Sequence, residues 1–323
     1  MRLNEEQSYK VQILRGLAII AVVFIHNTPE GLSQVIFRPF LNFSVGLFLF
    51  LSGLLSTADN WNPKKRITKV FVPYAIWTLL YVIIGNRNNL SNIPFAFLKG
   101  LLTAQAAAVM YYIFVYCQFT LLMPVIDKLA RSKYRYIGFA IAPVEILVMR
   151  LIPLISGYDF NRYVTWSMGI SCLGWFTYYY LGYMIGNDLL MIRCKTNTLV
   201  YTWIGAIALQ MLEGYWYLSM GEVNCGTQLK LSSILAGTIF AILSYRFIIL
   251  KKEIHSNPLK VLGDYSFGIY FSHLAVMGAL NLIPYYTKMI RYPLNAIVTI
   301  FISTACVYIG KKILGKNSKY LAL

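Results

Sequence analysis

Arg15 and His26 are two polar residues, eleven positions apart, in an otherwise apolar stretch of the chain. Eleven residues at about 100° each make three helical turns plus about 20°, so a helix would carry both side chains on one face. They would lie about 16 Å apart along the helix axis. Because imidazole accepts protons near neutral pH, His26 is a candidate general base. The alternative is that Arg15 is an interfacial anchor and His26 a hydrogen-bonded structural histidine.

His273 is a second candidate. A helix that starts near Asp264 would carry His273 about 14 Å along its axis, close to the depth predicted for His26. The alternative role is a hydrogen bond between packed helices. The remaining histidine, His255, falls in a polar loop.

Cations cluster just before Pro73, at Lys64, Lys65, Arg66 and Lys69. Lys65 and Lys69 have the i,i+4 spacing that brings side chains together on a helix, so the cluster could bind a polyanion such as a nucleotide phosphate. The alternative is an ordinary cytoplasmic loop of a membrane protein, in which Lys and Arg are enriched.

Two carboxylates, Glu145 and Glu213, also fall within apolar runs. Glu145 could pair with Arg150 or relay protons, and the sequence leaves both open. The five cysteines include no CxxC pair, and we interpret most of them as small buried residues, so no metal site is predicted. Phosphate-loop, dinucleotide-binding and GxSxG motifs are absent from the sequence.

The elements that must position these residues are membrane spans. The 323-residue chain is 58% hydrophobic and 13% charged, where a soluble chain carries about 25% charged residues. This composition excludes an ordinary cytosolic enzyme and a disordered protein. A span needs about 20 apolar residues. The sequence has about ten such runs, at residues 11–29, 36–56, 68–86, 106–126, 135–153, 168–186, 198–218, 229–250, 264–284 and 293–314. Residues 88–105 could add a short interfacial or re-entrant piece.

The net charge of +17 follows from 29 Lys and Arg against 12 Asp and Glu. If the N-terminus is cytoplasmic, about 21 of the 29 cations fall on the inner side and about 8 on the outer side. The prediction is therefore an all-α polytopic bundle of about ten transmembrane helices. It would form one domain over residues 1–323 in the cell membrane, with both termini cytoplasmic. The excess charge needs no nucleic-acid partner.

Four segments of the chain form a recognisable pattern when they are considered together: Arg15 with His26, FLFLSG at Phe48–Gly53, KRITKVFVPY at Lys65–Tyr74, and GDYSFGIYFSH at Gly263–His273. In this order, on a ten-helix frame, they resemble the membrane acyltransferase-3 family. Members transfer acyl groups, usually acetyl from acetyl-CoA, to extracytoplasmic glycans and related acceptors. Two positions depart from the family pattern. Tyr111 and Tyr112 stand where many members carry a Trp-Phe or Trp-Tyr pair, and Lys69 stands where Arg is common.

The resemblance implies a role for each candidate. His26 would be the catalytic base or a brief acyl carrier, and Arg15 would orient the donor or stabilise charge beside it. Lys65, Arg66 and Lys69 would hold the CoA phosphates at the cytoplasmic side. The choice among the substrate or oxyanion candidates stays open: they are Ser52, His273 and Glu145, with Arg15 as a further donor.

The expected partners are acyl-CoA, a glycan or lipid-linked envelope acceptor, and membrane lipid. Neither a metal nor a nucleic acid is expected. The alternative functions are a transporter or flippase for a glycan or small solute, motivated by a helical bundle without a soluble domain, and a catalytically silent member of the same fold.

Overall fold

The computed structural model describes residues 3–59, 61–156, 169–251 and 254–323. All regular elements among these residues are helices, and no strand occurs among them. The chain forms two compact units, and each consists of two separate chain segments. Unit 1 comprises Met1–Trp61 and Leu122–Asp264, and unit 2 comprises Asn62–Leu121 and Tyr265–Leu323.

Unit 1 begins with α1 (Glu5–Asn27), α2 (Leu32–Phe37), the 3-10 turn η1 (Arg38–Phe40) and α3 (Phe43–Leu54). After the second half of α6 (Tyr111–Arg131), it continues with short elements: η3 (Arg135–Phe139), α7 (Ile141–Ile146), the π-helical turn η4 (Leu147–Leu151), α8 (Ile152–Ser156) and η5 (Leu173–Trp175). Four helices complete it: α10 (Phe176–Gly186), α11 (Thr196–Ser219), α12 (Leu231–Ile249) and α13 (Asn257–Asp264).

The start of α1 is encoded locally. The Asn4 side chain accepts a hydrogen bond from the Gln7 amide at 2.8 Å, and the Gln7 side chain accepts one from the Asn4 amide at 3.1 Å. This reciprocal capping box satisfies two backbone donors that the first turn cannot pair. Glu5 and Glu6 in the first turn add the negative charge that a helix N-terminus favours.

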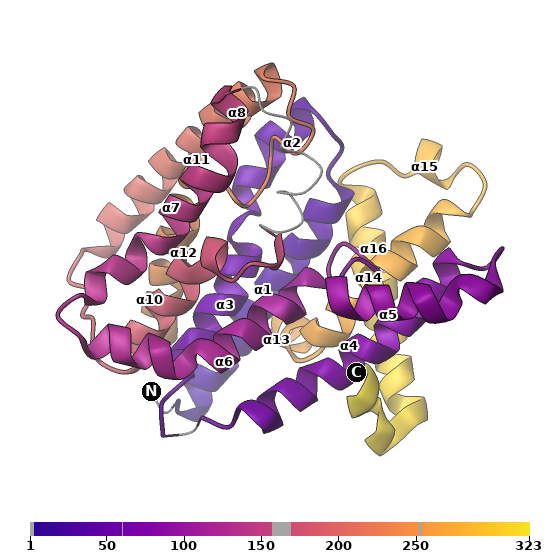
Figure 1. Cartoon of the computed structure of the whole chain (residues 1–323), viewed down its shortest axis with the longest axis horizontal. Coiled ribbons are helices and arrows are strands. Elements are labelled where there is room, and N and C mark those ends of the chain that lie inside the picture. The colour runs from indigo at the N-terminus through magenta and orange to yellow at the C-terminus, as the bar shows by residue number, and fades with distance from the viewer. Residues whose placement is uncertain (1–2, 60, 157–168, 252–253) are drawn as a thin grey trace. The chain divides into compact units, whose positions relative to one another are not determined.

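Close helix pairs build the core of unit 1 (Figure 1). The helices α3 and α10 pack side by side, as do α11 and α12, and α1 packs along α13. Figure 1 shows α1 and α3 in indigo, among the earliest parts of the chain. Their buried residues join one apolar cluster with α10 and α12, which includes Leu14, Phe50, Leu181 and Ala241.

Unit 2 contains α4 (Pro63–Gly85), the turn η2 (Leu90–Asn92), α5 (Ile93–Thr103) and the first half of α6, followed by α14 (Ser266–Asn281), α15 (Tyr286–Met289), α16 (Leu294–Leu314) and η6 (Gly315–Leu321). The Tyr74 hydroxyl on α4 donates to the carbonyl oxygens of Gly100 at 2.8 Å and Leu101 at 2.9 Å, which ties α5 to α4. The indole N–H of Trp77 donates to the carbonyl of Leu321 at 3.0 Å. Thus α4 is the element against which both chain segments of this unit pack.

Six helices among the described residues are long and apolar enough to cross a membrane: Glu5–Asn27, Leu32–Leu54, Pro63–Gly85, Tyr111–Arg131, Leu231–Ile249 and Leu294–Leu321. They confirm an all-helical chain with several candidate spans. Helices also occur in the other predicted runs but fall short of this length or apolarity, so the count of ten and the orientation stay predictions. The first residue of the run 168–186 and the cations Arg2, Arg162 and Lys252 lie outside the described residues.

Candidate functional site

Arg15 and His26 both lie on α1, which runs without interruption from Glu5 to Asn27. The predicted single helix is confirmed, and the helical repeat brings the two residues to one face, about 16 Å apart along the axis. Both side chains are half-buried. A half-buried imidazole can be shielded from bulk water and still meet a substrate.

The turn that carries Arg15 is fixed by a close contact between two helix backbones. A Cβ added at Gly16 would collide with the carbonyl oxygen of Leu259 on α13, and one added at Gly263 would collide with the carbonyl of Gln12 on α1. Glycine on both helices therefore lets the two backbones touch, as small residues do in membrane helix pairs. The first residue of the segment Gly263–His273 therefore serves helix packing.

The turn that carries His26 is held by hydrogen bonds to the last carbonyls of α1. The Thr28 hydroxyl donates to the carbonyl of Phe24 at 2.8 Å, and the Asn27 amide group donates to Val23 at 2.9 Å. Nη2 of Arg38 donates to the carbonyl of Ile25 at 3.3 Å. These side-chain donors add to the backbone bonds of the last turn, in which the Thr28 amide also donates to the carbonyl of Ile25 at 3.3 Å.

Ser52 lies in the last turn of α3 and is half-buried. Its carbonyl accepts a hydrogen bond from the Ser56 hydroxyl at 2.8 Å, and the Tyr179 hydroxyl donates to Ser56 at 3.1 Å. A Cβ at the neighbouring Gly53 would collide with the carbonyl oxygen of Tyr179 on α10. The Ser-Gly pair therefore combines a polar residue with the glycine that lets α3 and α10 approach.

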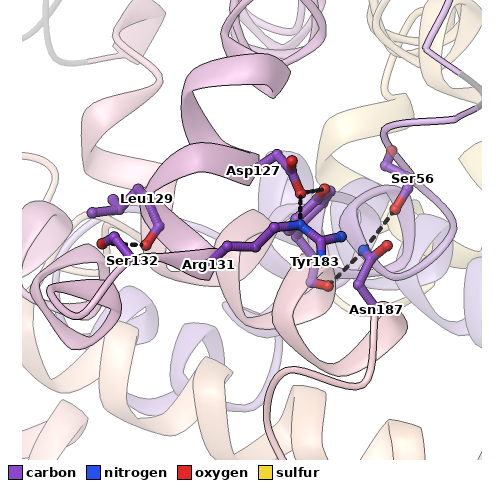
Figure 2. A network of polar contacts seen from close by, with 7 residues as sticks. All are labelled: Ser56, Asp127, Leu129, Arg131, Ser132, Tyr183 and Asn187. Atoms are coloured by element: carbon purple, nitrogen blue, oxygen red, sulfur yellow. Dashed lines mark hydrogen bonds and ion pairs between the residues drawn. The ribbon is translucent and has the colours of Figure 1, made fainter.

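A polar network follows at the ends of α3, α6 and α10 (Figure 2). Asp127 accepts hydrogen bonds from the Tyr183 hydroxyl at 2.6 Å and from Nε of Arg131 at 2.7 Å. The side-chain amide of Asn187 donates to the carbonyl of Ser56 at 3.0 Å. Sequence reasoning did not identify Asp127; the available signal was a carboxylate four residues before an arginine at the end of an apolar run.

Glu145 lies half-buried on α7, close to Gly174. Arg150 forms an ion pair with Glu222 across 3.1 Å, so among the described residues its carboxylate partner is Glu222 and not Glu145. The pairing considered from the sequence is therefore wrong, because the loop after α11 supplies a competing carboxylate. A proton-relay role for Glu145 stays a prediction.

The cation cluster occupies the first turns of α4 in unit 2. The Asn62 side chain accepts from the Lys65 amide at 3.0 Å, and Pro63 opens the helix, so the boundary is well specified. Lys65 and Lys69 are exposed and the first turn contains no acidic residue. The N-terminus of a helix carries a partial positive charge, so cations placed there are repelled by it. The partial charge of the helix and the charges of the lysines together attract an anion.

His273 is fully buried on α14 in unit 2. Its Nδ1 lies 3.0 Å from the carbonyl oxygen of Ile269, one turn earlier. The Tyr270 side chain beside it packs against Tyr112, with ring centroids 5.6 Å apart. No group of three or more His, Cys, Asp and Glu residues that could hold a metal ion occurs in the part of the chain that the structure describes.

Residues 8–311 match the family model of the acyltransferase domain, acyltransferase-3 type, which covers nearly the whole chain. The chain belongs to the acyltransferase-3 family. Together with its apolar helices, this membership identifies it as a multi-pass membrane protein with an acyltransferase domain. No significant match was found among curated proteins or among solved structures.

In this acyltransferase-3 member, the predicted site residues divide between the units. Unit 1 contains Arg15, His26, Ser52 and Glu145. Unit 2 contains the cation cluster and His273. Of the four signature segments, the first two lie in unit 1 and the third in unit 2, and the fourth, Gly263–His273, passes from unit 1 to unit 2 after Asp264. The structure gives the surroundings of each candidate within its own unit.

Proposed function

We propose that the protein is a membrane O-acyltransferase. It transfers an acyl group, acetyl in the simplest case, from cytoplasmic acyl-CoA to a hydroxyl of an extracytoplasmic glycan or lipid-linked cell-envelope precursor. Family membership supports the reaction class. The observation that carries the assignment of residues is the shared face of Arg15 and His26 on one uninterrupted helix.

The chemistry assigned to unit 1 is proton transfer at the acceptor hydroxyl. As the hydroxyl oxygen attacks the thioester carbon, His26 removes the hydroxyl proton, and the new C–O bond forms while the C–S bond breaks. The CoA thiolate leaves and is protonated by the imidazolium. In a two-step version, the His26 ring attacks first, carries the acyl group and then loses it to the hydroxyl. Arg15 or Ser52 would donate to the oxyanion as negative charge develops on the carbonyl oxygen.

The role assigned to unit 2 is donor binding. Lys65, Arg66 and Lys69 stand within two turns of the α4 N-terminus, where their charges and the helix dipole would attract the CoA phosphates. Pro73 has no N–H, so the carbonyl of Lys69 lacks its helical donor and α4 can bend just beyond the cluster. The donor would reach this cluster from the cytoplasm, in a cell-membrane protein with both termini cytoplasmic.

Thiol release from acetyl-CoA by purified protein tests the proposal. We expect His26→Ala to abolish release while the protein still folds, and His255→Ala to leave it unchanged. His255 is the matched control because it is an exposed histidine of the same unit. Unchanged release in His26→Ala would remove His26 from the mechanism. No release by the wild type, with solute counterflow in proteoliposomes, would favour a transporter; neither activity would indicate a silent member.

A further inference from the structure

Four cations lie within eight residues at the end of α6 and just after it: Lys128, Arg131, Lys133 and Arg135. Residues 128–144 contain no Asp or Glu. Asp127, the carboxylate directly before them, accepts hydrogen bonds from Arg131 and Tyr183 (Figure 2). The segment therefore supplies a carboxylate partner for its first arginine and none for the two cations that follow the helix.

Hydrogen bonds fix the backbone of residues 132–137, which we call the basic turn. The Ser132 hydroxyl donates to the carbonyl of Leu129 at 2.8 Å (Figure 2), and the Tyr134 amide donates to the same hydroxyl at 3.1 Å. The Tyr180 hydroxyl of α10 donates to the carbonyl of Arg135 at 2.6 Å. The basic turn is thus attached to the core of unit 1 and presents its side chains from a fixed backbone.

Cations and tyrosines alternate along the basic turn. Nζ of Lys133 lies 5.0 Å from the centre of the Tyr134 ring, and the guanidinium carbon of Arg135 lies 5.1 Å from that of Tyr136. The side chains of Tyr134, Tyr136 and Ile137 are 57%, 60% and 57% exposed. Lys133 is exposed as well, and Arg135 is half-buried. One short surface therefore combines positive charge with aromatic and aliphatic side chains that the protein leaves uncovered.

This combination suits the interfacial region of a membrane. The basic turn directly follows the candidate span Tyr111–Arg131, at the end predicted to be cytoplasmic. Tyrosine is favoured at the level of the lipid headgroups, because its ring is apolar and its hydroxyl is polar. The cytoplasmic leaflet contains anionic lipids, which attract Lys and Arg that lie next to a span.

We propose that the basic turn binds an anionic phospholipid of the cytoplasmic leaflet. Lys133 and Arg135 contact the lipid phosphate, and Tyr134, Tyr136 and Ile137 insert between neighbouring headgroups. The guanidinium and the ammonium group both donate hydrogen bonds to phosphate oxygens, and such charge-assisted bonds are strong. This lipid site belongs to unit 1 and exists whether or not the protein transfers acyl groups.

Lipid binding to the purified full chain tests the proposal. Native mass spectrometry compares the binding of phosphatidylglycerol, which is anionic, with that of zwitterionic phosphatidylcholine. We expect Lys133→Gln/Arg135→Gln to weaken phosphatidylglycerol binding about tenfold and to leave phosphatidylcholine binding unchanged. The matched control is Arg193→Gln/Lys195→Gln, which removes one Arg and one Lys at the same i,i+2 spacing from an exposed loop of the same unit. This control should bind both lipids as the wild type does.

The insertion of the rings has its own test in Tyr134→Ser/Tyr136→Ser. We expect this variant to weaken both lipids to a similar extent, because insertion of a tyrosine ring does not depend on the headgroup charge. Binding of both lipids at the wild-type level would show that the rings do not contribute to the site.

Three results would overturn the lipid site. The first is an unchanged affinity for phosphatidylglycerol in Lys133→Gln/Arg135→Gln. The second is an equal loss in both double cation variants, which would mean that net charge matters and this turn does not. The third is a loss of CoA binding in place of lipid binding, which would make the basic turn a site for the donor phosphates.

Amine footprinting of the wild-type protein covers the case in which a variant fails to fold. The labelling rates of Lys133 and Lys195 are compared in phosphatidylglycerol and in phosphatidylcholine nanodiscs. We expect labelling of Lys133 to be about threefold or more slower in phosphatidylglycerol, with Lys195 unchanged, because only Lys133 binds the headgroup. Equal rates for Lys133 in the two lipids, or equal protection of both lysines, would contradict a specific lipid site.

Discussion

Nη2 of Arg38 donates a hydrogen bond to the backbone carbonyl of Ile25, the residue before His26. The two groups are 3.3 Å apart and belong to the turn η1 and the end of α1. A cation at a helix C-terminus is favoured by the helix dipole. The Ile25 carbonyl accepts from the Thr28 amide at 3.3 Å as well as from Arg38. Arg38 therefore anchors the turn that presents His26, although it does not need to contact substrate.

Replacement of Arg38 by Met should slow acyl transfer more than it impairs binding. Met keeps most of the length of the side chain and removes every donor, so the His26 turn loses its anchor. We expect the kcat to fall roughly tenfold with the KM for acetyl-CoA little changed, because small misplacements of a catalytic group are costly. Steady-state thiol release measures both constants. Arg193→Met, at an exposed arginine of the same unit, is the control, and an equal kcat in the two variants would contradict the anchoring role.

Gly53 should be intolerant of even one methyl group. An alanine Cβ at this position would collide with the Tyr179 carbonyl, which is backbone and cannot rotate away. We expect Gly53→Ala to destabilise the protein by about 1–3 kcal/mol, as overpacking does. Gly205 on α11 meets nothing within 4 Å, so Gly205→Ala should leave stability unchanged or slightly raised. Thermal unfolding in detergent compares the two variants. Equal melting temperatures would contradict the close backbone contact between α3 and α10 at Gly53.

The sequence predicts those features of the fold that depend on apolar runs and on the helical repeat. The apolar run 11–29 becomes α1, and the helical repeat alone predicts the shared face of Arg15 and His26. The run 264–284 is less accurate, because helix α13 starts at Asn257 and a break at Tyr265 precedes α14. The close packing of Gly263 on α1 helps to fix that boundary, and such contacts leave no periodic signal.

Long-range polar contacts explain the rest of what sequence reasoning missed. Tyr81 lies 190 residues from Phe271 in the chain, and neither hydropathy nor spacing links them. Asp127 and Tyr183 are 56 residues apart, and each alone is an ordinary residue near the end of a helix. Both contacts exist only after distant helices have packed. The division of the chain into two units made of alternating segments has the same origin.

Cys194 offers a direct test of orientation. It is exposed and lies between Arg193 and Lys195, in a loop predicted to be cytoplasmic. In a chain that keeps Cys194 alone, a membrane-impermeant maleimide should label inverted vesicles but not intact cells. Cys225, kept alone, should stay unlabelled on both sides, because it is buried and burial raises the pKa of its thiol. Labelling of Cys194 in intact cells would reverse the predicted topology.

The donor role of the cation cluster can be tested with two matched lysine pairs. Lys65 and Lys69 are exposed i,i+4 neighbours at the start of α4, and Lys312 and Lys316 are exposed lysines with the same spacing near the end of α16. Both pairs belong to unit 2 and are predicted to be cytoplasmic, so they carry equal charge on the same side of the membrane.

Lys65→Gln/Lys69→Gln should raise the KM for acetyl-CoA about tenfold with little change in kcat, because charge-assisted contacts to phosphates bind substrate and transition state alike. Lys312→Gln/Lys316→Gln should leave both constants near wild type. The difference should shrink as salt rises from 0.05 to about 0.5 M, since exposed charges are screened over a shorter distance. A similar KM for both double variants would mean that the cluster serves topology alone, and that the donor phosphates bind elsewhere.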